Sequence, residues 1–218
     1  MENKAFKNKG DWYYNLYKNG IASLIPEGPH NILDLGCGTG ILGYKLKELN
    51  KAREVVGVEV FRDAADEAEK HYEKVYHGDI EQLNLDYEEY FDFVVCSDIL
   101  EHLRDPWEIL RRIHVWLKSE GHALFSIPNI RYWRVLRDLI FRGRWEYLEA
   151  GILDNTHLRF FTRKSFFRAL REAGFDIEYS RMEINGIKHN LFNTVTFHVL
   201  EEFMGKQVIV LAKKKGYR

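Results

Sequence analysis

The stretch that decides the fold is LDLGCGTG, residues 33–40, in which an apolar run leads directly into three closely spaced glycines. Glycine has no Cβ, so the backbone can turn sharply here and approach a ligand closely. Residues 31–35 before the loop predict a buried strand, and residues from Gly40 to about Leu49 predict a helix. Strand, glycine turn and helix in this order indicate the ligand-binding end of an α/β sheet, although a tight turn alone gives a similar pattern.

The rest of the chain alternates between strand-like and helix-like segments. Asp105, followed by Pro106, and Thr162 are expected to cap helices, and Gly174 is expected to end the second of these. Further strands are expected at residues 54–60, 74–77, 91–96, 122–127, 175–182 and 207–212. This alternation predicts an α/β fold, a Rossmann-like sheet of seven mostly parallel strands with helices on both faces.

Two segments fall outside the alternation. Residues 1–29 predict an N-terminal helix that Asp11 caps and Pro26 stops. Residues 129–161 are aromatic and basic and lie between the fifth strand and the next helix that packs on the sheet. Because ligands bind at the carboxyl ends of parallel strands, we expect this insertion to form a small cap there, within one domain of residues 1–218.

Composition excludes several classes of protein. The formal net charge of the 218 residues is −1, which argues against a nucleic-acid or anionic-membrane partner attracted by the whole surface. Cys37 and Cys96 lie in apolar runs, away from any zinc-type cluster. The first residues lack the apolar run of a signal peptide, and no segment carries 18 apolar residues. We therefore expect a cytoplasmic protein with no membrane contact.

Three features strengthen the case for a ligand at the glycine loop. The spacing is G-x-G-x-G, whereas a dinucleotide site shows G-x-G-x-x-G. Glu59 ends the second predicted strand, where a carboxylate can accept hydrogen bonds from ribose hydroxyls. Asp34 lies within the apolar strand, and a buried carboxylate needs hydrogen bonds or a cation, which loop N–H groups and a ligand ammonium group can supply.

With these features the chain resembles class I S-adenosylmethionine-dependent methyltransferases over roughly residues 30–130. Gly78-Asp79-Ile80 resembles the family motif whose aspartate contacts adenine, and residues 91–102 resemble its fourth-strand motif. The resemblance implies an antiparallel seventh strand, S-adenosyl-L-methionine as cofactor and S-adenosyl-L-homocysteine as product. The implied cofactor-binding residues are Tyr14, Asp34, Gly36, Cys37, Gly38, Thr39, Gly40, Glu59, Val60, Gly78, Asp79, Ile80, Ser97 and Asp98.

Methyl transfer from a sulfonium mainly requires an aligned acceptor and a base for its proton. His157 is the leading candidate base, with Asp154 orienting it or the acceptor, and His102 after the fourth strand is the second. Structural hydrogen bonding explains His157 equally well, and packing beside the cofactor explains His102. Asp98, Glu101 and His102 would form a metal site if they shared a helical face, but we expect no metal.

The cap supplies candidate acceptor-binding residues. Residues 129–133 and 151–162 resemble bacterial methyltransferases associated with small molecules and cell-surface polysaccharides, which implies a sugar-containing acceptor. Arginines interleaved with Trp133, Trp145 and Tyr147 suit a phosphate or sugar group, although a solvated helix face explains them as well. The expected substrate-binding residues are Glu101, Asn129, Arg131, Tyr132, Trp133 and Arg159.

The expected function is methyl transfer to an oxygen or nitrogen of a small acceptor. An RNA or protein methyltransferase and a cofactor-binding module without catalysis remain as alternatives. A nicotinamide dehydrogenase is disfavoured by the glycine spacing. The sequence predicts no oligomeric state.

Overall fold

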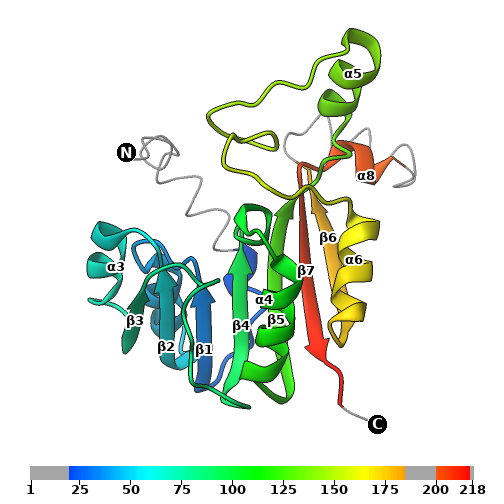
Figure 1. Cartoon of the computed structure of the whole chain (residues 1–218). Helices are drawn as coiled ribbons and strands as arrows, with labels where there is room; N and C mark the ends of the chain where they lie inside the picture. The colour runs from blue at the N-terminus through cyan, green and yellow to red at the C-terminus, as the bar shows by residue number, and fades with distance from the viewer. Residues whose placement is uncertain (1–19, 185–199, 217–218) are drawn as a thin grey trace.

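The computed structural model describes residues 20–184 and 200–216. Seven strands form one sheet in the order β3-β2-β1-β4-β5-β7-β6, and helices cover both of its faces (Figure 1). The strands are β1 (His30–Leu35), β2 (Ala52–Glu59), β3 (Lys74–His77), β4 (Phe91–Ser97), β5 (Leu117–Pro128), β6 (Phe175–Glu183) and β7 (Gln207–Lys214). The helices are α2 (Ile41–Glu48), α3 (Arg62–Ala68), η2 (Leu100–His102), α4 (Pro106–Trp116), α5 (Trp133–Arg142), α6 (Arg163–Glu172) and α8 (Glu201–Met204).

Strand direction matches the sequence prediction. β1 pairs in parallel with β2 and β4, β2 with β3, and β4 with β5. β7 runs antiparallel to both β5 and β6. The predicted Rossmann-like sheet with an antiparallel last strand is therefore confirmed, and the parallel strands end together at one edge.

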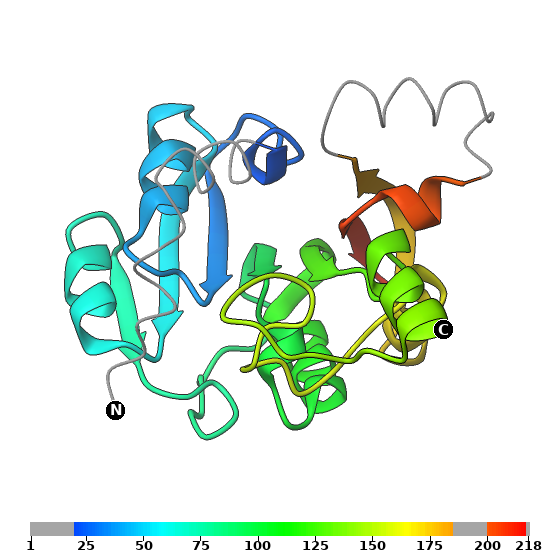
Figure 2. The same ribbon diagram turned by 90° about the horizontal axis from the view of Figure 1, so that it is seen from above.

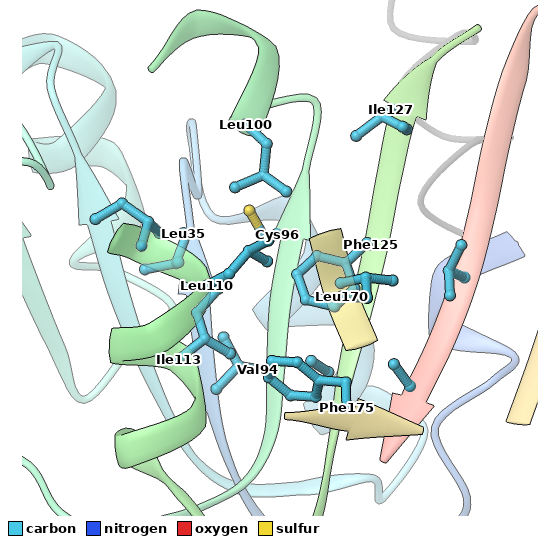
Figure 3. Close-up of a cluster of buried hydrophobic side chains, with 14 of the residues drawn as sticks. Leu35, Val94, Cys96, Leu100, Leu110, Ile113, Phe125, Ile127, Leu170 and Phe175 are labelled. Atoms are coloured by element: carbon cyan, nitrogen blue, oxygen red, sulfur yellow. The ribbon is translucent and has the colours of Figure 1, made fainter. Parts of the chain in front are cut away.

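Alternate residues of the central strands build two separate cores. Leu33 and Leu35 of β1 face a core with α4 and α6, whereas Ile32 faces a core with α2 and α3. Figure 3 shows the first of these, in which Leu110 and Ile113 of α4 lie against the sheet. Full burial of such a side chain stabilises the fold by roughly 1.5–3 kcal/mol relative to its exposed state. The period-2 pattern of each strand thus fixes which helices lie on which face.

Two helices begin where the sequence predicts them. The side chain of Asp105 accepts a hydrogen bond from the Glu108 N–H (3.0 Å) at the start of α4, with Pro106 in the first turn. Thr162 and Ser165 exchange side-chain and backbone hydrogen bonds at the start of α6, which is a capping box. These caps set where each helix leaves the sheet edge.

β5 is longer than expected, because Gly121 lies inside the strand and does not precede it. Phe91 pairs with Leu117 and Phe93 with His122, so the register shifts at this point. A Cβ on Gly121 would lie 3.2 Å from the Phe91 carbonyl oxygen. The glycine therefore marks a bulge within the sheet. In the sequence alone, a glycine at such a bulge looks like the boundary of a strand.

The insertion at residues 129–161 rises above the carboxyl ends of the strands, and α5 stands at its far end (Figures 1 and 2). Its return segment bonds to η2 through the Leu158 and Arg159 N–H groups, which both donate to the Glu101 carbonyl oxygen (2.8 and 2.9 Å). Asn129 and Phe161 form an isolated bridge at the base of the insertion. Among the described residues, no helix is long and apolar enough to cross a membrane.

Candidate functional site

A cleft of about 1640 Å³ lies between the carboxyl edge of the sheet and the cap. It is lined by residues from β1, β2, β4, η2 and the cap. Of the predicted site residues, the lining includes Asp34, Gly36, Gly38, Thr39, Glu59, Val60, Gly78, Asp79, Ile80, Ser97, Asp98, Glu101, His102, Tyr132, Asp154 and His157. Most of the predicted site thus meets in one place.

The three glycines of the loop have different physical roles. All three adopt positive φ angles, +68° at Gly36, +56° at Gly38 and +81° at Gly40. A Cβ on Gly36 would lie 2.0 Å from the Ile99 side chain, and one on Gly40 would lie 2.9 Å from the Ala68 Cα. A Cβ on Gly38 would meet no protein atom within 4 Å. Gly36 and Gly40 allow close packing, whereas Gly38 keeps the floor of the cleft open.

Glu59 ties the loop to the end of β2. Its Oε2 accepts a hydrogen bond from the Gly38 N–H (2.8 Å), and its Oε1 accepts one from the Phe61 N–H (3.0 Å). The residue is buried yet lines the cleft. An ionised carboxylate has about four acceptor positions. Glu59 can therefore hold the loop and also accept hydrogen bonds from a ligand's hydroxyl groups.

Tyr72 is a site residue that the sequence analysis missed. Its hydroxyl donates to Asp34 Oδ2 (2.6 Å) and accepts from the Gly43 N–H (3.0 Å) in the first turn of α2. Burial, and then the charge of Asp34, raise the pKa of Tyr72 well above its ordinary value. A tyrosine hydroxyl therefore stabilises the buried Asp34 carboxylate, and no motif in the sequence links these two positions.

The next two strands supply the neighbouring wall. Asp79 lies after β3, where its Oδ1 accepts from the Glu81 N–H (2.9 Å). Asp98 lies after β4 with φ at +56°, a conformation that non-glycine residues rarely adopt. The Gln207 amide of β7 donates to Asp98 Oδ1. Strained backbone of this kind concentrates at functional sites.

These groups fit an adenosyl sulfonium ligand. The open space over Gly38 admits a ligand against bare backbone, and Glu59 offers acceptors to a ribose. Asp79 lies on the adjacent strand end, where the predicted adenine contact falls. Cys37 and Gly40 belong to the loop but are not among the residues that line the cleft. Tyr14 lies outside the described residues.

The candidate catalytic groups meet beneath the cap. Glu101, His102 and His157 each offer a carboxylate oxygen or ring nitrogen, and these atoms all lie within 4.8 Å of one another. The two imidazole rings pack edge to face with centroids 4.7 Å apart. Glu101 is 1% exposed and His157 is 7% exposed. Residues separated by more than 50 positions in the sequence thus form one cluster.

Asp154 contacts this cluster through Thr156. Its Oδ1 accepts from the Thr156 N–H (2.8 Å) and from the Thr156 hydroxyl (2.6 Å). The same hydroxyl lies 3.0 Å from His102 Nδ1. His157 Nδ1 lies 3.0 Å from the Ile152 carbonyl oxygen. Asp154 therefore contacts His102 through Thr156, and a backbone carbonyl contacts His157; the orienting role expected of Asp154 toward His157 or the acceptor stays a prediction.

Four predicted substrate-binding residues lie outside the lining of this cleft. The Asn129 amide donates to the Glu202 and Gly205 carbonyl oxygens, and Arg131 forms an ion pair with Glu202. The Trp133 side chain lies in a separate apolar hollow beside α8. Arg159 donates to the Arg104 carbonyl oxygen and lies over Trp107. In the structure these residues join the cap to its surroundings, and their substrate contacts stay predictions.

Other cations line the cleft instead. Arg134 and Arg137 of α5, Arg144 after it, and Lys206 before β7 all face the cleft. Arg137 is paired with Asp138 (2.9 Å). From the sequence alone a solvated helix face was the favoured explanation of the cap arginines, because the sequence does not orient α5 relative to the sheet. Lys206 belongs to no sequence motif that would mark it as a site residue.

The chain was compared with known proteins. A family model described as a methyltransferase domain matches residues 12–180. A protein of Acinetobacter baylyi named ubiquinone biosynthesis O-methyltransferase is 27% identical over 168 residues, 73% of this chain and 67% of that protein. A Coxiella burnetii protein of the same name is 30% identical over 114 residues, 47% of this chain and 45% of that protein, so the match spans under half of that relative. The crystal structure of a SAM-dependent methyltransferase from Archaeoglobus fulgidus has a TM-score of 0.69 at 21% identity and covers 97% of both chains.

Proposed function

The chain belongs to the methyltransferase-domain family and is an S-adenosylmethionine-dependent enzyme, and from this premise we propose that it methylates a hydroxyl oxygen of a small, phosphate- or sugar-bearing acceptor. The observation that carries the proposal is the cluster of Glu101, His102 and His157 beneath the cap. This cluster lies in the same cleft as the glycine loop and Glu59. This arrangement supports a methyl donor bound beside a group that can accept the acceptor's proton.

The reaction is an in-line displacement at the sulfonium methyl. A lone pair of the acceptor oxygen forms the new O–CH₃ bond, and the S–CH₃ bond breaks with its electron pair left on sulfur. The hydroxyl proton leaves toward the imidazole cluster, and from there to solvent. The enzyme's contribution is alignment and proton removal, because the cofactor already carries an activated methyl group.

The cations of the cleft support an anionic acceptor. Arg134, Arg137 and Arg144 of the cap and Lys206 before β7 line the cleft. Guanidinium groups bind phosphate oxygens through paired hydrogen bonds. Relatives named O-methyltransferase favour oxygen over nitrogen as the methylated atom. The net charge of −1 argues against a nucleic-acid acceptor.

Acceptor profiling tests this proposal. Labelled S-adenosylmethionine is incubated with panels of sugar phosphates, sugar nucleotides, phenols, primary amines and short RNAs, and methyl incorporation is scored for each. We expect turnover on hydroxyl compounds that carry phosphate, reduced at least tenfold in an Arg134→Gln, Arg137→Gln double variant. Turnover confined to amines or RNA would contradict the oxygen acceptor. Turnover on uncharged phenols that the double variant leaves unchanged would contradict the anionic acceptor.

A further inference from the structure

We propose that Glu101, His102 and His157 bind one divalent transition-metal ion at the junction of the sheet and the cap. The three residues offer one carboxylate oxygen and two imidazole nitrogens. This donor set suits Zn²⁺, Mn²⁺, Fe²⁺ or Co²⁺ more than Mg²⁺, which prefers oxygen ligands. The inference deepens the proposed function, on which it depends for the role of the ion but not for its binding.

The tautomers of both histidines prepare the site. His157 Nδ1 faces the Ile152 carbonyl oxygen (3.0 Å), and a carbonyl only accepts, so Nδ1 carries the proton. The Thr156 hydroxyl donates its proton to Asp154, so it accepts from His102 Nδ1. In each neutral ring Nε2 then carries the lone pair. Metal-binding histidines typically donate their other N–H to a carbonyl or carboxylate in this way.

The burial of Glu101 supports a positive charge at this point. Its side chain follows Leu100 into the interior, and the residue is 1% exposed. A carboxylate removed from water costs several kcal/mol unless a cation or hydrogen bonds compensate it. The charge of Glu101 also contributes to the raised pKa of Cys96, after burial. A divalent ion bound to the carboxylate would contribute to this compensation.

The three ligand atoms are spaced more widely than one ion requires. Two ligands bonded to one ion at about 2.0–2.2 Å in tetrahedral geometry lie about 3.3–3.6 Å apart, whereas the ligand atoms here all lie within 4.8 Å of one another. The backbone that carries the ligands is already fixed, because the Glu101 carbonyl oxygen accepts from the Leu158 N–H directly after His157. Rotation of the three side chains on this fixed backbone therefore has to draw their ligand atoms closer together to close the site.

The ligand set differs from the alternative considered for the sequence, in which Asp98 joined Glu101 and His102. Asp98 Oδ1 accepts from the Gln207 amide, and His157 from the cap takes the third position in the cluster. Three protein ligands leave coordination positions for an acceptor oxygen. An acceptor hydroxyl bound to the ion would lose its proton more readily. Because the ion would occupy both imidazoles, the proton would then pass to water, and transfer to an imidazole would belong to the metal-free chain.

The test is metal binding by the full chain after removal of any histidine tag and treatment with a chelator. Zn²⁺, Mn²⁺ and Mg²⁺ are titrated by calorimetry, and Co²⁺ is titrated by its visible d–d absorption. We expect one Zn²⁺ or Co²⁺ per chain and at least tenfold weaker binding of Mg²⁺. His157→Ala and Glu101→Gln should each weaken Zn²⁺ binding at least tenfold and change the Co²⁺ spectrum.

His122→Ala is the matched control. His122 also lies beside a carboxylate, Glu178 at 3.0 Å, but in the middle of β5 and outside the lining of the cleft. It should bind Zn²⁺ like the unaltered chain. Absence of saturable Zn²⁺ binding, or binding that His157→Ala leaves unchanged, would overturn the proposal. Because Glu101 is buried, thermal unfolding is measured for His157→Ala and Glu101→Gln to show whether each variant folds. If one of them does not fold, His157→Gln is tested in its place.

The metal site and the proposed function can fail separately. If the chain binds Zn²⁺, His157→Ala abolishes that binding, and no hydroxyl acceptor is methylated, the proposed acceptor is wrong and the proposed metal site stands. If the chain methylates hydroxyl acceptors but binds no Zn²⁺ or Co²⁺, the proposed metal site is wrong and the proposed acceptor stands. The two readouts therefore test different statements.

Discussion

The Tyr72 hydroxyl donates a 2.6 Å hydrogen bond to the Asp34 carboxylate beneath the glycine loop. The ring of the same tyrosine fills the space beside three glycines, since a Cβ on Gly40, Gly43 or Gly57 would lie 3.2 Å or less from it. Its hydroxyl also accepts from the Gly43 N–H at the start of α2, where the N-cap residue Gly40 has no side chain to do so. One aromatic side chain thus fixes the loop, the first strand and the following helix relative to one another.

Tyr72→Phe should therefore weaken both the fold and cofactor binding. The variant leaves a buried carboxylate without this donor, which should cost roughly 1–3 kcal/mol of unfolding free energy. Because Asp34 also lines the cleft, we expect a dissociation constant for S-adenosylhomocysteine raised about tenfold. Urea denaturation and calorimetry measure the two effects. Tyr179→Phe is the control, because the Tyr179 side chain on β6 is exposed. Equal changes in unfolding free energy and in dissociation constant for the two variants would contradict the role of Tyr72.

Gly38→Ala should block the cofactor while the fold survives. The added methyl group would project into the open cleft, where the bound ligand is expected. Gly143→Ala is a close control, because Gly143 has φ +61° against +56° at Gly38 and also has no atom within 4 Å of a Cβ. Both variants should lose about 1–2 kcal/mol of stability from backbone strain. Only Gly38→Ala should lower S-adenosylhomocysteine affinity, by at least tenfold. Equal affinity in the two variants would mean that the ligand does not lie over Gly38.

Glu59→Ala should weaken S-adenosylmethionine binding by about 1–3 kcal/mol, or roughly 5- to 150-fold. The variant removes acceptors for the ribose and frees the Gly38 N–H to which Glu59 is bonded. Glu67→Ala on α3, where Glu67 pairs with Lys70 at the surface, should leave affinity unchanged. Calorimetry with the intact cofactor measures both. An unchanged affinity in Glu59→Ala would place the ribose elsewhere.

The sequence was sufficient for the cofactor side because local patterns specify it. Each local pattern determines the structure of the few residues around it. The period-2 apolar runs form strands, Asp105 and Thr162 begin helices, and the glycine loop forms the turn between a strand and a helix. The order of parallel strands then brings Glu59 and Asp79 to the same edge. Each step depends on neighbours in the sequence, and the structure confirms the resulting fold.

The acceptor side depends on contacts between distant segments, which the sequence does not encode locally. Tyr72 reaches Asp34 across 38 positions, and Thr156 reaches His102 across 54. Cap residues such as Arg159 could not be assigned to the cleft or to a structural role from the sequence alone. That assignment required the contacts of the cap's return segment with η2. Gly121 was misplaced for the same reason, because a bulge depends on the partner strand.

Stability should fall in mild acid partly because of His114. This histidine of α4 is 6% exposed, its Nε2 lies 3.3 Å from the Lys215 carbonyl oxygen, and burial lowers its pKa below the ordinary 6.5. Below that ordinary value the unfolded chain binds a proton that the folded chain does not, so the unfolding free energy drops as pH falls toward the folded pKa. Above the ordinary value this penalty is absent.

His114→Gln should remove this part of the pH dependence. Urea denaturation between about pH 7.5 and about pH 5.5 should show a smaller loss of unfolding free energy in the variant than in the unaltered chain. The variant also loses the edge-to-face contact with Phe175 (5.5 Å), so its stability should be lower at both pH values. The comparison is therefore made on the difference between the two pH values. An identical difference in both proteins would remove His114 from the account.

Thr156→Val should lower methyl transfer while leaving the cofactor in place. Valine keeps the shape of threonine but cannot accept from His102 Nδ1 or donate to Asp154. His102 Nδ1 then retains the longer contact with the Thr156 carbonyl oxygen (3.3 Å), so the orientation of the His102 ring is less well fixed. Loss of such a supporting hydrogen bond typically costs 10- to 100-fold in metal affinity or activity, and we expect a reduction of at least tenfold in kcat and in Zn²⁺ affinity. Calorimetry with S-adenosylhomocysteine should show no change, since Thr156 lies on the cap and the glycine loop is untouched. Thr156→Ser retains the hydroxyl and should restore both kcat and Zn²⁺ binding. Failure of serine to restore them, with valine and serine equally impaired, would show that the methyl group of Thr156 matters and its hydroxyl does not.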